Sequence, residues 1–99
     1  MLTVFIEYKI DAEKRSHALQ LLTSMAERME AMGARQYRSM EGLDQPGLFV
    51  ETFEVETVQV YEEIKANRLA DQDFCDCISG GASKLHVWAF RPAEMDEKE

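Results

Sequence analysis

"MEGLDQPGLFVETFEVETVQVYEEI", residues 40–64, contains the passage from a turn through a strand into a helix that decides the fold. Its proline-glycine pair predicts a type II turn, because proline fixes φ at the first central position and glycine tolerates the positive φ of the second. Residues 48–55 predict a strand, and Thr57 is placed to cap a helix that runs to about residue 69. Glu51 stands in the middle of this apolar strand, so its carboxylate needs a partner there.

Further elements flank this passage. Alternating apolar residues predict a strand at 2–10, and Asp11 is placed to cap a helix whose apolar stripe runs to Met32. Gly33 ends that helix, because glycine adopts the left-handed conformation without strain. The remaining elements are a strand at 34–40 paired with 48–55 as a hairpin, a short helical turn at 70–78, a loop at "SGGAS" and a strand at 85–91. The order β-α-β-β-α-β predicts an α+β, ferredoxin-like plait, with one domain over residues 1–92 and a polar tail at 93–99.

The composition excludes several classes of protein. Of the 99 residues, 45% are hydrophobic and 30% are charged, which is typical of a soluble globular protein. A formal charge of −8 argues against nucleic-acid binding, because a phosphate backbone needs a basic face. The apolar runs are shorter than the roughly eighteen residues of a membrane span, and the apolar start of the chain lacks the basic region of a signal peptide. We therefore expect a cytoplasmic protein that binds neither nucleic acid nor membrane.

Two cysteines stand close together, Cys75 and Cys77. They cannot complete a tetrahedral zinc site within the chain, because no further cysteine and no nearby histidine accompanies them. We interpret them as reduced thiols, of which at least one is buried. A contribution of both to a metal site between subunits is the alternative. We expect neither a metal nor a cofactor.

Apolar residues occupy both faces of the predicted sheet. The last strand, "LHVWAF", places Val87 on one face and Trp88 and Phe90 on the other. The third strand is also apolar on both faces, and the first adds Phe5 opposite its aliphatic row. Uncovered aromatic residues would leave a large apolar patch, and the same face of a second copy is the simplest cover. We therefore expect an obligate homodimer in which two sheets pack together as a barrel.

In this respect the chain resembles the dimeric α/β-barrel superfamily, which includes antibiotic-biosynthesis-type monooxygenases and haem-degrading enzymes. The resemblance spans residues 2–91 and rests on element order and on "FVETFEVETVQVYEEI", which is similar to the family's third strand and second helix. It implies a histidine on the second helix, after an aromatic residue at the position of Phe53. That helix offers Tyr61 and Glu62 instead, and Glu7 stands where haem-degrading members have asparagine. These departures argue against haem and against the family's oxygen chemistry.

Two strand glutamates form the candidate site. In the ferredoxin-like strand order 4-1-3-2 the first and third strands are neighbours, which can place Glu7 and Glu51 side by side on one sheet face. Two carboxylates in partly apolar surroundings need a shared proton or a cation. The candidate partners for them on the second and fourth strands are Arg35, Tyr37, Arg38, Lys84 and His86.

Two hypotheses describe this constellation. In the first it is a pocket whose catalytic residues are Glu51, His86 and Tyr37, with the glutamate as a general base. The residues expected to contact the ligand are Glu7, Arg38, Phe53, Met25 and Trp88. In the second hypothesis the glutamates pair with arginine or lysine across the sheet or the dimer and fix the strand register.

Three functional classes remain. The preferred one is a binder of a small hydrophobic or aromatic molecule, held in a pocket between helices and sheet. The alternatives are a cofactor-independent, monooxygenase-like enzyme and a purely structural or interaction dimer. An open cavity lined by Glu51, Tyr37 and Met25 would favour the first two classes, and a filled core would favour the third.

Overall fold

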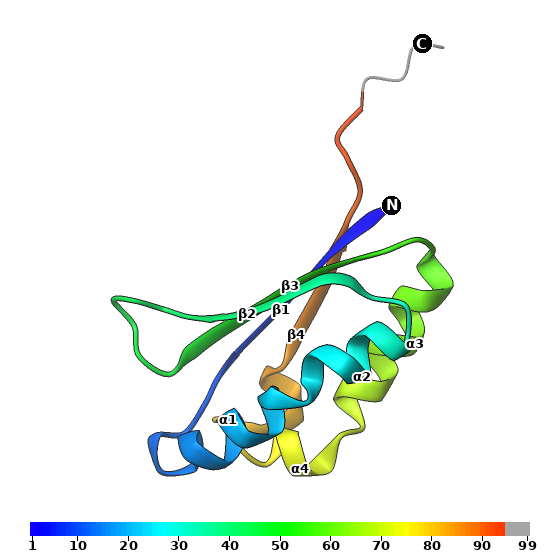
Figure 1. Ribbon diagram of the computed structural model, residues 1–99. Coiled ribbons are helices and arrows are strands. Elements are labelled where there is room, and N and C mark those ends of the chain that lie inside the picture. Colours follow the sequence, from blue (N-terminus) through cyan, green and yellow to red (C-terminus); the bar gives the residue numbers. More distant parts are fainter. Residues whose placement is uncertain (95–99) are drawn as a thin grey trace.

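The computed structural model describes residues 1–94 and confirms the α+β, ferredoxin-like class. One four-stranded antiparallel sheet carries its helices on one face, and the opposite face is open (Figure 1). The strands are β1 (Leu2–Lys9), β2 (Arg35–Glu41), β3 (Leu48–Val55) and β4 (His86–Phe90). The helices are η1 (Ala12–Lys14), α1 (Arg15–Thr23), α2 (Met25–Ala31), α3 (Val58–Leu69), α4 (Gln72–Cys75) and η2 (Gly81–Lys84).

The strand order is β2-β3-β1-β4, as the plait predicts. In the pairing of β1 with β3, Ile6 lies opposite Glu51 and Glu7 lies opposite Val50. Since paired residues point to the same face of a sheet, this register decides which side chains meet the helices. Glu51 shares a face with Ile6, and Glu7 shares the other face with Val50.

The stretch at residues 40–64 forms the turn, the strand and the capped helix that the sequence predicts. Gly47 has φ of +94°, and the N–H of Leu48 donates to the carbonyl of Gln45 at 3.1 Å, which closes the turn. Strand β3 follows at once. The hydroxyl oxygen of Thr57 accepts a hydrogen bond from the N–H of Val60 at 3.1 Å and so caps α3. These contacts fix where α3 begins and therefore which of its residues face the sheet.

The first predicted helix differs from expectation, because it is interrupted. Ser24, with φ of −100° and ψ of 0°, separates α1 from α2. The hydroxyls of Thr23 and Ser24 donate to carbonyls three residues earlier, at 2.6 and 3.3 Å, and such bonds compete with the helical ones. Asp11 is also not the predicted side-chain cap, because its carboxylate accepts a hydrogen bond from the hydroxyl of Ser79.

Smaller corrections concern the C-terminal part. Residues 81–83 of the predicted loop belong, with Lys84, to the short helix η2. Strand β4 covers residues 86–90 rather than 85–91, because its pairing with β1 extends from Phe90 opposite Thr3 to His86 opposite Glu7. The short helical turn predicted at 70–78 is confirmed as α4.

The core lies between the sheet and the helices, which Figure 1 shows as a layer beneath the strands. The predicted stripe of the first helical region is confirmed for Ala18, Leu22, Met25 and Met29, which are all buried. Cys75 and Cys77 are both buried free thiols, and burial raises the pKa of each. Among residues 1–94, no helix has the length and apolar character needed to cross a bilayer.

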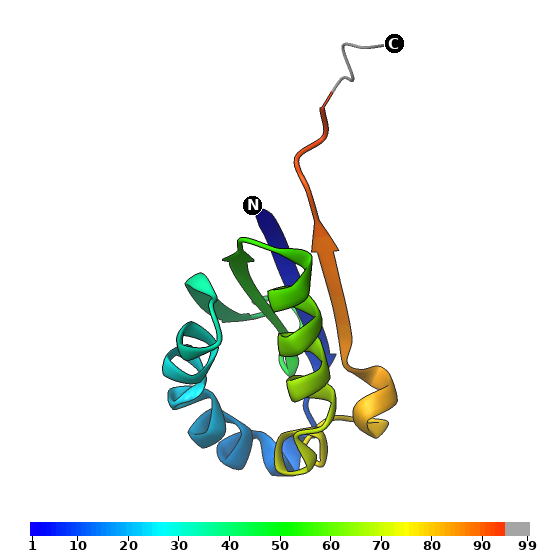
Figure 2. The same cartoon turned by 90° about the vertical axis from the view of Figure 1, so that its right-hand side faces the viewer.

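The chain leaves the sheet after β4 and extends past its edge (Figures 1 and 2). Residues 91–94 are exposed and irregular. The rest of the predicted tail, residues 95–99, lies outside the described residues.

A buried carboxylate network and two surface hollows

Glu51 lies at the centre of the face that the helices cover. Strand β3 alternates strictly, and Phe49, Glu51, Phe53 and Val55 all point into the core. The exposed fraction of Glu51 is 0%. An unpaired carboxylate at such a position would cost several kcal/mol or take up a proton, so its partners determine what it can do.

Arg68 is the main partner of Glu51. It lies on α3 one turn after Ile64, and its exposed fraction is also 0%. Its Nη1 donates to Oε1 of Glu51 at 2.6 Å and its Nη2 donates to Oε2 at 2.7 Å. This fork geometry is the strongest form of an arginine–carboxylate contact. The guanidinium also lies 4.9 Å from the ring centre of Phe74.

Two tyrosines complete the network. The hydroxyl of Tyr8 on β1 donates to Oε2 of Glu51 at 2.5 Å, and the hydroxyl of Tyr37 on β2 donates to Oε1 at 2.7 Å. The ring of Tyr8 is held by Phe49, stacked with centroids 5.9 Å apart, and by Phe74, edge-on at 5.1 Å. The network therefore joins three strands to α3.

The electrostatics of the network are mutually reinforcing. Burial by itself would raise the pKa of Glu51, but the hydrogen bonds and charge of Arg68, with both tyrosine hydroxyls, hold that pKa below its usual range. Burial also works against the charge of Arg68, but the hydrogen bonds and charge of Glu51 raise the pKa of the guanidinium. Burial, followed by the charge of Glu51, raises the pKa of Tyr8 and of Tyr37. Glu51 is therefore ionised and both tyrosines are neutral at neutral pH.

The geometry limits what this carboxylate can do chemically. Two carboxylate oxygens offer about four acceptor positions, and Arg68, Tyr8 and Tyr37 supply four donors. A carboxylate that is fully bonded, ionised and inaccessible is poorly suited to take a proton from a substrate. Among residues 1–94, one buried polar atom of the network lacks a partner, the Nε of Arg68.

The predicted pairing of Glu7 with Glu51 is wrong. The register places them on opposite faces of the sheet, and Glu7 lies half-buried on the open face. Arg38 and His86, proposed as partners of Glu51, also lie on the open face, opposite Thr52 and Glu7 respectively. Of the predicted partners, Tyr37 does contact Glu51. A shift of one residue in this register would have reversed the assignment, because successive side chains of a strand point to opposite faces of the sheet.

The other predicted residues divide between the two faces. Met25 and Phe53 are buried in the core, and the ring of Phe53 lies 6.1 Å from that of Tyr37. Trp88 lies on the open face with 45% of its surface exposed, and the imidazole of His86 stacks on it at 5.6 Å. Glu51, Tyr37 and Phe53 are thus brought together, and Met25 lies in the same core, whereas the remaining candidates lie across the sheet.

Sequence reasoning did not identify two members of the network, Arg68 and Tyr8. The signal for Arg68 was its spacing, because it follows Tyr61 by seven residues and Ile64 by four on the apolar side of α3. An arginine in such a stripe indicates a buried anion. Tyr8 falls in the apolar row of the alternating strand at 2–10, and that pattern does not reveal the role of its hydroxyl.

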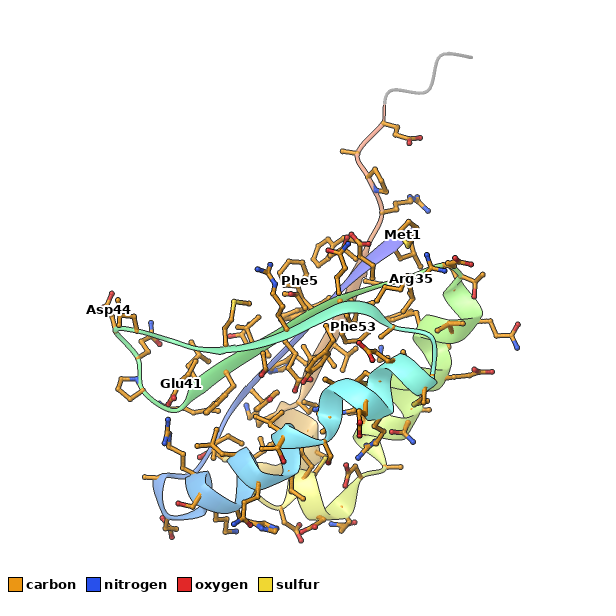
Figure 3. The ribbon with its side chains drawn as sticks, viewed as in Figure 1. Met1, Phe5, Arg35, Glu41, Asp44 and Phe53 are labelled. Atoms are coloured by element: carbon orange, nitrogen blue, oxygen red, sulfur yellow. The ribbon has the colours of Figure 1, made fainter. Side chains whose placement is uncertain are left out.

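The open face carries an apolar patch. Phe5, Val50, Trp88 and Phe90, together with Glu7, line a hollow of about 300 Å³. The exposed fractions of Phe5 and Phe90 are 38% and 53%, and their rings meet edge-on at 5.5 Å. Figure 3 shows Phe5 and Phe53 on opposite sides of the sheet. The predicted apolar second face is present on β1 and β4, although the phenylalanines of β3 belong to the core face.

A second hollow, of about 400 Å³, lies between α1 and the β2–β3 hairpin. Its lining residues are Leu19, Leu22 and Thr23 from α1, Ser39, Met40 and Glu41 from β2, and Phe49 from β3. Glu41, labelled in Figure 3, accepts bonds from Nη2 and Nε of Arg15 at 2.5 and 3.1 Å. It also accepts a bond from the N–H of Gly47 at 2.8 Å.

Comparison with known proteins identifies the fold. The sequence matches no protein-family model, and no curated protein matches it significantly. A candidate antibiotic biosynthesis monooxygenase from Deinococcus radiodurans superposes with a TM-score of 0.68 at 21% identity, covering 97% of this chain and 96% of its own. A conserved protein from Methanosarcina mazei Go1 gives 0.71 at 14% identity over 93% and 92% of the two chains. Rv0793 from Mycobacterium tuberculosis gives 0.67 at 17% identity over 95% and 96%.

These identities show the fold alone. The chain therefore shares its fold with antibiotic biosynthesis monooxygenase-like proteins, and the ferredoxin-like fold expected from the sequence is confirmed.

Proposed function

We propose that the protein is a non-catalytic binder of a small hydrophobic molecule, held in the hollow between α1 and the β2–β3 hairpin. The observation that carries this proposal is the hollow itself, whose volume of about 400 Å³ falls in the range of about 300–1,000 Å³ typical of small-molecule sites. Its walls are formed by Leu19, Leu22 and Phe49, with a few polar groups between them. It lies between a helix and the sheet, the location expected of the pocket, but Glu51, Tyr37 and Met25 do not line it. Glu51 and Met25 are buried in the core instead, and this filled core favours the structural dimer as the second candidate.

The state of Glu51 supports a binder over an enzyme. The expected general base is ionised, fully bonded and inaccessible, and it functions in this proposal as a structural tie between sheet and α3. The likeness to proteins named antibiotic biosynthesis monooxygenases favours the enzymatic alternative. That alternative would need a different acid–base group. Among the described residues that line the hollow, Glu41 is the one carboxylate, and it is already bonded to Arg15 and Gly47.

We further propose that the protein acts as a homodimer, in which the open faces of two sheets pack together. Phe5, Trp88 and Phe90 form an exposed aromatic patch of the kind that marks an interface. Charge also favours a second copy as the occupant. The chain carries −8 overall, but on the open face Glu7 and Glu54 are balanced by Lys9 and Arg38. A third basic residue, Arg35, lies opposite Glu54 and is paired with Glu56. Two such faces can therefore approach without net repulsion.

The binding proposal is tested with toluene and phenol as neutral probes. Chemical-shift mapping by NMR should show saturable changes at Leu19, Leu22 and Phe49. The variant Leu19→Trp should abolish them, because an indole fills the hollow. Val58→Trp is the matched control, since Val58 is 60% exposed on α3. Saturable changes centred on the Glu51 network would favour the enzymatic alternative. If neither probe causes a saturable change, the binding proposal fails and the structural dimer is favoured.

The dimer proposal is tested by sedimentation. The wild type should be dimeric at micromolar concentration, and Phe90→Asp should be monomeric because it would bury an unpaired carboxylate of each subunit in the interface. Leu43→Asp is the control, since Leu43 at the hairpin tip is 94% exposed and lies outside the patch. A wild type that sediments as a monomer at that concentration would overturn the barrel assembly.

A further inference from the structure

We propose that a further hollow, at the end of the sheet where β1 ends and β4 begins, binds a small molecule that carries one carboxylate group. This hollow has a volume of about 270 Å³, and Lys9, Lys84 and His86 lie in its lining. We call it the basic hollow. It shares no lining residue with the hollow between α1 and the hairpin, so the inference goes beyond the proposed function and does not depend on it.

The lining of the basic hollow has the opposite sign of charge to the chain as a whole. Among its described residues two lysines face one carboxylate, that of Glu7, which leaves a net charge of +1 while His86 is neutral. The whole chain carries −8. At physiological ionic strength, exposed charges more than about 8 Å apart are largely screened, so an anion in the hollow responds mainly to the lining. Among residues 1–94, neither lysine takes part in an ion pair, and nor does His86.

The two lysines are held near one another by the loop that precedes β4. The N–H of Ser79 donates to the carbonyl of Lys9 at 2.8 Å, which fixes the start of this loop against the end of β1. Gly80, with φ of +85°, leaves space for the side chain of Lys84, because a Cβ atom at position 80 would lie 2.6 Å from Cγ of that lysine. The stem of Lys84 therefore packs against the loop, and its ammonium group is restrained.

His86 is held by different contacts. It lies opposite Glu7 in the pairing of β4 with β1, and its ring stacks on that of Trp88 with centroids 5.6 Å apart and planes inclined by 7°. An imidazole presents at least one N–H donor whether it is neutral or protonated. Two ammonium groups and one imidazole, from β1, η2 and β4, thus meet at the basic hollow. Because they are restrained before a ligand arrives, binding costs less conformational entropy.

The charge and the shape of the lining favour a carboxylate over other groups. A single negative charge balances the net charge of the lining, and hydrogen bonds from ammonium groups to an ionised oxygen are stronger than neutral ones. A phosphate dianion would leave one charge unbalanced close to Glu7. A cation would meet two lysines. The apolar part of the ligand can lie on Leu48 and on the stems of the lysines, which are apolar up to the ammonium group.

The experiment compares benzoate with benzamide, which has nearly the same shape without the charge, and with inorganic phosphate. Each is titrated against the full chain at neutral pH, with the dissociation constant taken from NMR shifts at Lys9, Lys84 and His86. We expect benzoate to give saturable shifts and to bind roughly tenfold or more tightly than benzamide or phosphate. Lys84→Met and Lys9→Met should each weaken benzoate roughly three- to tenfold, since one charge-assisted bond at a partly exposed site is lost.

Lys65→Met is the matched control. It removes the same charge from α3, where the ammonium group of Lys65 lies 5.8 Å from the ring centre of Tyr61, and it should leave benzoate binding unchanged. The inference is overturned if Lys65→Met weakens benzoate as much as Lys84→Met, because the effect would then be one of overall charge. Equal binding of benzamide and benzoate would overturn it too, as would tighter binding of phosphate.

A lack of saturable benzoate shifts at the basic hollow would likewise overturn the inference. The proposed function is assessed separately, because toluene and phenol are followed at Leu19, Leu22 and Phe49 in the other hollow. Either site can therefore fail without the other.

Discussion

The two faces of the sheet are formed by the same strands, but one buries a charged group and the other exposes apolar side chains. On the helix side a single carboxylate is buried among aromatic and aliphatic residues, and four donors from three elements surround it. On the open side the apolar rings of Trp88 and Phe90 remain about half exposed to solvent. The comparison teaches that a buried charge must find all of its partners within the subunit, whereas an apolar surface can obtain its cover from another molecule.

The largest effect is expected at the buried pair. Glu51→Leu should lower the free energy of unfolding by about 3–5 kcal/mol, because it leaves the buried guanidinium of Arg68 without a counter-charge. Urea denaturation measures this directly. The double variant Glu51→Leu/Arg68→Met should recover a large part of the loss, since neither charge is then buried alone.

An exposed ion pair serves as the control for the Glu51 and Arg68 variants. In Arg35 and Glu56 the side chains are 60% and 58% exposed, and exposed pairs of this kind contribute little. Glu56→Leu should therefore change stability far less than Glu51→Leu. Equal losses at the two positions would show that Glu51 is not the tie between sheet and α3. A Glu51→Leu variant that keeps its stability but loses probe binding would support a ligand site at the network.

Trp88 tests the open face. In the isolated subunit its ring is 45% exposed, so Trp88→Ala should alter the unfolding of the monomer only slightly. In a dimer the same ring would be a central anchor, and its removal should weaken association by about 2 kcal/mol or more. Sedimentation over a range of concentrations separates these effects. If the variant dimerises as tightly as the wild type, the aromatic patch is not the interface.

The network also predicts how stability depends on pH. The pKa of Glu51 is lowered by folding, so its contribution is present above the usual value of about 4.3 and is lost as pH falls through the lower native value. The pKa of Tyr8 and of Tyr37 is raised, so their contribution is present below about 10 and is lost at higher pH. Ultraviolet titration of tyrosinate should show both tyrosines ionising together with alkaline unfolding. Ionisation of two or more tyrosines in a still-folded chain would contradict the network.

The smallest effect is expected at the N-terminal cap of α3, the helix that carries Arg68. Thr57→Ala removes the side-chain acceptor for the N–H of Val60 and should cost about 1 kcal/mol. Thr57→Ser keeps the acceptor and should cost only a fraction of that. Thermal unfolding of the two variants measures the difference. A larger loss in the serine variant would show that the methyl group, rather than the cap, holds α3.

Most of the fold could be predicted from the sequence, because its signals are local. The turn before β3, the strand itself and the cap at Thr57 depend on residues a few positions apart, and each was found where predicted. The break at Ser24 was missed because the apolar stripe continues through it. The candidate site was predicted less well, because it depends on which face each side chain takes. Glu7 and Glu51 could be assigned only once the register of β1 against β3 was known.

The four side chains of the network are distant along the chain, and this has a consequence for how the protein folds. Tyr8 and Glu51 are 43 residues apart, and Arg68 follows Glu51 by 17. Contacts that close such long loops form after local turns and helices, so we expect the network to assemble on the native side of the folding barrier. Its energy would then retard unfolding more than it speeds folding. Stopped-flow kinetics of Tyr37→Phe should show faster unfolding with a nearly unchanged folding rate, so that the buried carboxylate sets the lifetime of the native state.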